Sequence, residues 1–120
     1  MSAADVAGDI VAAAAYARTL PFVRAAEIDV IGWSRGGSGV LAVLATLPAG
    51  GPAPFRKAVA YYPECYVETP WRVRIPLLML LAGKDDISFT RGCEELVKRM
   101  GGDFPLEVRN EAPPQFGGRL

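Results

Sequence analysis

The chain has 120 residues, of which 13 are basic, 13 are acidic and none is histidine, so its formal net charge is zero. This length allows one domain at most, and the balanced charge gives no reason to expect nucleic acid, an anionic membrane or a highly charged substrate as a partner. The lack of histidine excludes a histidine-ligated metal, a histidine general base and a complete Ser-His-Asp triad within this chain. We therefore expect neither a metal nor a cofactor.

Helical and strand patterns alternate along the chain and are separated by glycine or proline. In chain order the sequence predicts a helix, a strand, a helix, two strands, a helix and a strand, over residues 3–19, 28–32, 38–47, 58–62, 75–82, 90–100 and 106–109. The strand at 75–82 is almost wholly apolar, as a strand covered on both faces should be. This alternation predicts an α/β fold with a mostly parallel sheet and flanking helices, in which the last strand lies near an edge.

Signals for targeting and for disulfides are weak. The N-terminal stretch is alanine-rich and has no basic start, so it does not match a signal peptide, and no run approaches the roughly 18 apolar residues of a membrane span. We therefore expect a cytoplasmic protein. Cys65 and Cys93 form neither a CxxC motif nor a zinc-binding spacing, and we expect two reduced, partly buried thiols. The alternative is a disulfide, which requires the fold to bring the two residues together.

The strongest chemical signal lies where the first predicted strand meets the next helix, in the sequence Gly32-Trp33-Ser34-Arg35-Gly36. This is the G-x-S-x-G pattern of a nucleophile elbow, in which a tight strand-to-helix turn lifts a serine hydroxyl above the sheet. We expect Gly32 and Gly36 to be glycine because side chains there would clash across the turn. The backbone N–H of Arg35 would then help to hold a developing oxyanion. A plain glycine-rich turn with a solvated serine is the alternative.

Two phosphate-binding motifs compete for the same glycines. A P-loop needs lysine followed by serine or threonine after its second glycine, whereas Ser38-Gly39 stands there. A dinucleotide-binding fingerprint placed on residues 37–42 starts too far beyond the strand and has no acidic residue about 20 positions later. We therefore favour the elbow.

Two neighbouring carboxylates, Asp85 and Asp86, follow the apolar strand predicted at 75–82. A loop after a parallel strand lies at the carboxyl end of the sheet, which is also the end where the elbow emerges. Serine followed by aspartate is the chain order of α/β-hydrolases. Either carboxylate is a candidate for the orienting acid of the site, and the alternative is a structural role in the turn or as a helix cap.

With these two sites placed, the chain resembles the C-terminal half of the dienelactone hydrolase family of α/β-hydrolases. The matching stretches are IDVIGWSRGG, FRKAVAYYPEC and IPLLMLLAGKDDISFTRGCEEL, which cover most of residues 25–100. The resemblance implies a partial α/β-hydrolase fold that acts on a small-molecule carboxylic ester or lactone, with Ser34 as nucleophile. It favours Asp85 over Asp86 as the acid, because Ser88 stands at the family's spacing, although Phe89 replaces the usual proline.

The sequence departs from that family in two places. The family's catalytic histidine lies in an Ala-x-His-x-Phe-like segment, and here Ala112 and Phe116 flank Pro114 in its place. The family's N-terminal strands, and the loop that supplies the second oxyanion N–H, are absent from these residues. We therefore expect residues 1–120 to form one incomplete hydrolase domain that is inactive or very weak by itself, because a serine hydroxyl is a poor nucleophile without a base.

Three hypotheses follow for the whole chain: a fragment or degraded copy of a hydrolase, a pseudo-enzyme or binding module, or one piece of an enzyme completed by another chain. A missing neighbouring strand would leave a sheet edge and apolar surface exposed, so self-association through that edge is a further expectation.

Near the serine, Trp33 and Tyr62 are expected in the core more than in a pocket, Glu64 in a loop role, and the Arg35 side chain either on a substrate carboxylate or in a structural ion pair.

Overall fold

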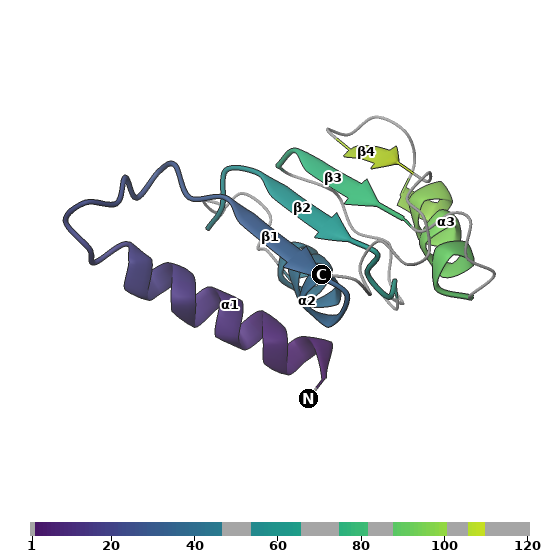
Figure 1. Cartoon of the computed structure of the whole chain (residues 1–120), viewed down its shortest axis with the longest axis horizontal. Helices are drawn as coiled ribbons and strands as arrows, with labels where there is room; N and C mark the ends of the chain where they lie inside the picture. The colour runs from purple at the N-terminus through teal and green to yellow at the C-terminus, as the bar shows by residue number, and fades with distance from the viewer. Residues whose placement is uncertain (1, 47–53, 66–74, 82–87, 101–105, 110–120) are drawn as a thin grey trace.

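A parallel four-stranded sheet forms the centre of the molecule (Figure 1). The computed structural model describes residues 2–46, 54–65, 75–81, 88–100 and 106–109. The strands follow one another across the sheet in chain order, and every neighbouring pair is parallel. They are β1 (Val30–Trp33), β2 (Ala58–Tyr61), β3 (Leu77–Leu80) and β4 (Leu106–Arg109). The predicted α/β class, the parallel sheet and the place of the last strand at an edge are thus confirmed.

Within the described residues three helices accompany the strands: α1 (Ala3–Ala17), α2 (Arg35–Ala45) and α3 (Ser88–Met100). The sequence predicted all three, but it placed the start of the second helix at residue 38. Helix α2 begins three residues earlier, directly after Ser34. Glycines at the front of this helix hid its start, since glycine has a low helix propensity that tertiary packing overrides here.

Helix α2 covers one face of the sheet at β1 and β2. Side chains alternate along β2 and β3, so Ala58, Ala60, Leu77 and Met79 face the core and are buried. The opposite positions, including Leu78, are only half-buried. Burial of one face of β2 and β3 therefore fixes the register of these two strands, because a slip by one residue would turn the apolar set to the other face.

Helix α1 starts with a capping box and packs on α2. The Ser2 hydroxyl accepts a hydrogen bond from the Asp5 N–H, and the Asp5 carboxylate accepts one from the Ser2 N–H. On the packed side the helices approach closely, because a Cβ at Gly39 would lie 2.3 Å from Cγ1 of Val6. Among the described elements, α1 makes contact with α2 and with no strand.

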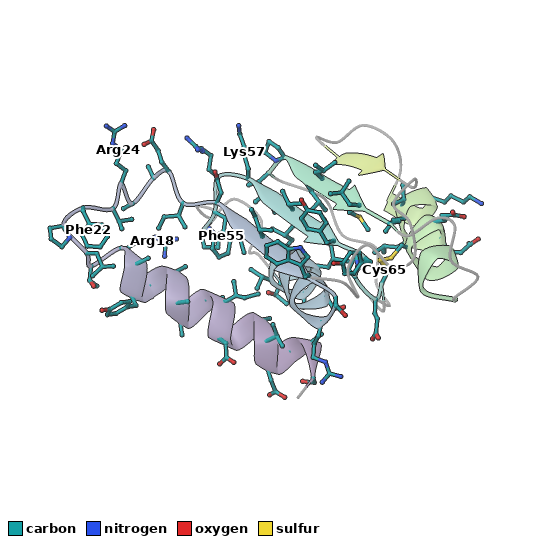
Figure 2. The ribbon with its side chains drawn as sticks, in the orientation of Figure 1. Arg18, Phe22, Arg24, Phe55, Lys57 and Cys65 are labelled. Carbon is teal, nitrogen blue, oxygen red and sulfur yellow. A yellow bond between two sulfur atoms is a disulfide. The ribbon has the colours of Figure 1, made fainter. Side chains whose placement is uncertain are left out.

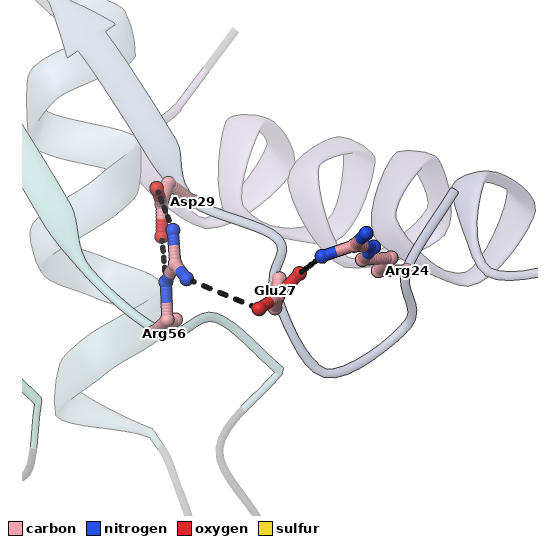
Figure 3. Close-up of polar contacts among 4 residues, drawn as sticks. All are labelled: Arg24, Glu27, Asp29 and Arg56. Atoms are coloured by element: carbon pink, nitrogen blue, oxygen red, sulfur yellow. Dashed lines mark hydrogen bonds and ion pairs between the residues drawn. The ribbon is translucent and has the colours of Figure 1, made fainter. Parts of the chain in front are cut away.

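Ion pairs join the amino-terminal ends of β1 and β2 (Figure 3). Nε and Nη2 of Arg56 donate to the two carboxylate oxygens of Asp29 at 3.2 and 3.1 Å, and Nη1 lies 3.7 Å from Glu27. Glu27 in turn pairs with Arg24 at 3.3 Å. The hydrogen bond from Arg56 lowers the pKa of Asp29 below its ordinary value. These contacts lie at the end of the sheet opposite Ser34.

Cys65 and Cys93 form a disulfide, so the expectation of two reduced thiols is wrong (Figure 2). The segment after β2 runs beside α3 and brings the two Cα atoms to 4.9 Å, which is within the range that a disulfide spans. Sequence spacing could not show this approach, because the pair is 28 residues apart and meets only through the fold.

Candidate active site

Ser34 occupies the turn between β1 and α2, at the carboxyl end of the sheet. Its backbone has φ 53° and ψ −116°, a conformation that favours glycine and strains a residue with a Cβ. The side chain is exposed, and its hydroxyl does not cap the helix that it precedes. The sequence placed a strained serine at this junction, and the structure has one there.

Only one of the two elbow glycines is required by packing. A Cβ at Gly32 would lie 2.4 Å from the carbonyl oxygen of Gly36, so any larger residue would force the turn apart. A Cβ at Gly36 would meet nothing within 4 Å. The expectation that both glycines avoid a clash is therefore confirmed for Gly32 and wrong for Gly36. The close approach is between the Gly32 Cα and the helix backbone rather than between two side chains.

Hydrogen bonds to two elements, β2 and α2, hold the Ser34 backbone. Its N–H donates to the Tyr61 carbonyl at 2.9 Å, which continues the β1–β2 ladder up to the turn. Its carbonyl accepts the Ser38 N–H at 3.0 Å and the Ser38 hydroxyl at 3.2 Å. The same Ser38 oxygen accepts the Glu64 N–H at 2.8 Å. Ser38 thereby ties the first turn of α2 to the segment after β2.

Sequence reasoning missed Ser38. The signal was a single hydroxyl residue at the start of an otherwise apolar stretch, and we read that stretch only as helix-compatible. The structure buries this side chain to 7% exposure. A buried hydroxyl needs hydrogen-bond partners, and here it has both a donor and an acceptor across two elements.

The first backbone amides of α2 lie directly after Ser34. Amides in a first helical turn have no partner within their own helix, and the helix dipole adds partial positive charge there. The Arg35 N–H is the first of them, so its position in the chain is that of an oxyanion donor. The Arg35 side chain is exposed.

An aromatic cluster flanks the serine on the sheet face away from α2. The Trp33 and Tyr61 rings are stacked, with centroids 5.3 Å apart and planes 6° apart, and Tyr62 meets Tyr61 edge-on at 6.1 Å. Trp33 is 47% exposed, so the expectation that it lies in the core is wrong. It alternates outward because Gly32 takes the inward position. Tyr62 is half-buried, and desolvation raises the pKa of its hydroxyl.

The other predicted site residues lie outside the described residues: Asp85, Asp86 and Pro114. Because β1 and β3 are parallel, the chain leaves β3 at the same end of the sheet at which it reaches Ser34. Within the described part, no group of three or more Cys, Asp or Glu side chains could hold a metal ion. No helix found there is long and apolar enough to cross a bilayer.

No model of a known protein family matches this chain, and a search of curated proteins finds no match to it. The likeness to dienelactone hydrolases therefore stands on the sequence motifs, and the geometry at Ser34 is a separate observation.

Proposed function

We propose that the chain carries the nucleophile part of a serine hydrolase site for small carboxylic esters or lactones, of the dienelactone hydrolase type. Ser34 is the nucleophile, the Arg35 N–H is an oxyanion donor, and Asp85 is the acid. The single observation that supports this most is the strained backbone of Ser34 at a strand–helix junction, held by hydrogen bonds on both sides.

This arrangement fits acyl transfer for a physical reason. A serine that merely capped α2 would adopt an extended backbone and turn its hydroxyl to the helix amides. Ser34 does neither, so its hydroxyl is not engaged with those amides. An ester carbonyl attacked by this hydroxyl would develop negative charge next to the start of the helix, where backbone N–H groups stabilise it.

The chain lacks one part of the reaction. A general base must take the serine proton, and no histidine is present. We propose that the wild-type chain alone is therefore close to inactive, and that Pro114 stands where the family has its histidine.

Turnover of p-nitrophenyl acetate by three variants tests the proposal. The Pro114→His variant should hydrolyse the ester faster than wild type by on the order of a hundredfold, the usual contribution of a positioned base. Adding Ser34→Ala to that variant should return the rate to the wild-type level. A Pro114→Gln variant is the matched control, since it removes the proline and adds no base. Equal rates in all variants would contradict the proposal.

A binding module that has lost catalysis is the second candidate. It is favoured by the absence of any histidine together with the exposed, stacked Trp33 beside Ser34. It predicts that ester analogues perturb Trp33 fluorescence equally in wild type and in Ser34→Ala, with no covalent labelling of either.

We propose the cytoplasm as the compartment on the sequence signals alone, and the disulfide opposes this. Disulfides are rare in reducing cytosol and persist in oxidising compartments. Trapping free thiols with an alkylating reagent at the moment of lysis decides the matter. Alkylation of both cysteines would support the cytoplasm. Alkylation of neither cysteine would support an oxidising compartment.

A further inference from the structure

Residues 62–65, which we call the bridging segment, follow the carboxyl end of β2 and lie beside α3 (Figure 2). Cys65 is the last residue of this segment and is bonded to Cys93 of α3. The Cys93 sulfur also lies 3.2 Å from the Pro63 carbonyl oxygen, and the Pro63 side chain is fully buried. The disulfide therefore fixes one end of the bridging segment to α3.

The other end of the bridging segment has a strained backbone. Tyr62 has φ 35°, and in the described part of the chain Ser34 and Tyr62 are the two residues other than glycine with a positive φ. The Tyr62 N–H donates to the Leu80 carbonyl at 2.6 Å, which holds this residue on β3. Strain of this kind persists only where the surrounding structure imposes it, and it gathers at active sites and switches. The bridging segment is thus a strained turn that β3 holds at one end and the disulfide holds at the other.

Ser38 connects the bridging segment to Ser34. The Glu64 N–H donates to the Ser38 hydroxyl oxygen at 2.8 Å, and that hydroxyl donates to the Ser34 carbonyl at 3.2 Å. Glu64 is the residue next to Cys65, so a continuous series of contacts leads from the disulfide to the backbone of Ser34. Because the Ser38 side chain is buried, movement of the Glu64 N–H would leave its oxygen without that donor, and the hydroxyl would shift to find another partner.

We propose that the Cys65–Cys93 disulfide is a redox switch for the serine nucleophile, an inference that rests on the proposed function. The oxidised form holds the bridging segment against Ser38 and keeps Ser34 in its reactive conformation. In the reduced form the strained turn at Tyr62 loses an anchor, the segment moves away from Ser38, and Ser34 reacts more slowly because the reaction depends on a fixed geometry. In the cytoplasm, the compartment proposed above, disulfides are usually transient and catalytic or redox-sensing.

The reductant of this switch is a dithiol, which reduces the disulfide by thiol–disulfide exchange. Its first thiolate attacks the Cys65 sulfur, forms a mixed disulfide and expels Cys93 as a thiolate, which takes up a proton. Its second thiol then attacks the reductant's own sulfur in the mixed disulfide and expels Cys65. The dithiol supplies two electrons and two protons and becomes a disulfide, while both cysteines become thiols. Attack falls on Cys65 because that residue is 7% exposed and Cys93 is 0% exposed.

Amide chemical shifts of the wild-type chain test the connection without any hydrolysis. Addition of dithiothreitol should shift the amide resonances of Glu64, Ser38 and Ser34. It should leave those of Val30 and Lys57, at the opposite end of the sheet, unchanged. Unchanged Ser38 and Ser34 resonances in the reduced chain would overturn the switch. Loss of shift dispersion throughout the chain would also overturn it, because reduction would then unfold the protein rather than move one segment.

Labelling of Ser34 by a serine-reactive fluorophosphonate tests the effect on reactivity, after the reductant has been removed under nitrogen. The oxidised wild-type chain should label faster than the reduced chain by on the order of tenfold, the effect expected for one hydrogen bond to a buried group. Equal rates in the two forms would overturn the switch and leave the proposed function standing. No label on Ser34 in either form would contradict the proposed function, and the switch with it.

Two variants test the path through Ser38 in the same labelling experiment. Ser38→Ala removes the hydroxyl between the bridging segment and Ser34, so its oxidised and reduced forms should label at the same rate. Thr46→Ala is the matched control, because it removes a hydroxyl that donates to the Val43 carbonyl at 3.0 Å at the other end of α2. It should respond to reduction as the wild-type chain does. A Ser38→Ala chain that keeps the full response to reduction would overturn the proposal.

Discussion

Ser34 holds a conformation that glycine adopts more easily than any residue with a side chain. Strain of this kind costs on the order of 1–3 kcal/mol. Replacing the serine with glycine relieves the strain, but the greater freedom of glycine in the unfolded chain offsets up to about 1 kcal/mol of that gain. We therefore expect Ser34→Gly to raise the free energy of unfolding by about 1 kcal/mol, and Ser34→Ala, which keeps the Cβ, to leave it nearly unchanged. Urea unfolding of the two variants checks this. A Ser34→Gly variant less stable than Ser34→Ala would contradict the strained turn.

The two elbow glycines give opposite expectations for the same substitution. Gly32→Ala drives a Cβ to 2.4 Å from the Gly36 carbonyl oxygen, which should lower the free energy of unfolding by about 2–3 kcal/mol. Gly36→Ala meets open space at the start of α2 and should leave stability unchanged or raise it by up to about 1 kcal/mol. Denaturant titration of both variants measures the difference, and equal losses would show that the turn is not packed in this way.

At the scale of single residues, the sequence located the strained turn at Ser34. Ser34 and Gly32 were predictable because the G-x-S-x-G spacing is tied to one backbone shape. The role of Ser38 was not, because its two partners come from the turn and from the segment after β2, which only the fold brings together. The exposure of Trp33 depends on which face of β1 helix α2 covers, and the residue pattern of a four-residue strand does not show which face that is.

At the scale of elements, the disulfide joins the segment after β2 to α3 over a separation of 28 residues. Closing a loop of this length removes unfolded-state entropy worth on the order of 3 kcal/mol. Reduction of the wild-type chain should therefore lower its free energy of unfolding by about that amount. Denaturant unfolding with and without dithiothreitol measures the loss within one sequence. A Cys65→Ala plus Cys93→Ala variant that is insensitive to the reductant is the control, and an equal effect of reductant on it would contradict the assignment.

The Asp29–Arg56 pair should make stability depend on pH. Its hydrogen bond lowers the pKa of Asp29 in the folded state, so the pair stabilises the fold above the ordinary value of 3.8 and stops doing so as the pH falls through the lowered pKa. Asp29→Asn should reduce the melting temperature at neutral pH and have no effect at the acid end of the titration. Both side chains are exposed, so the effect is small. Asp9→Asn, on the exposed side of α1, is the control.

Element order and strand direction were predictable for a common reason. Glycine and proline mark the ends of the segments, and the apolar strands between helical patterns leave a parallel sheet as the natural solution. Boundaries were less predictable, as the early start of α2 shows. The cysteine pairing was not predictable either, because two cysteines far apart in sequence are ordinarily expected to be buried thiols, and only the fold brings the segment after β2 beside α3.

At the scale of the whole molecule, the outer edge of β1 and helix α1 are the features to consider. Among the described residues β1 has no strand neighbour on its outer side, and most residues of α1 are exposed. Among the described elements α1 packs on α2 and contacts no strand. Strand β1 is thus the outermost strand of the described sheet on one side and leads at its carboxyl end into the strained Ser34.

Labelling by a serine-reactive fluorophosphonate, mapped by peptide mass spectrometry, tests the central claim most directly. The account predicts slow labelling of the folded wild-type chain and labelling of Pro114→His that is faster by on the order of a hundredfold, with the adduct on Ser34 alone. It also predicts that Pro114→His with Ser34→Ala takes up no label. A folded Pro114→His chain that labels no faster than wild type, or a label on another serine, would contradict it.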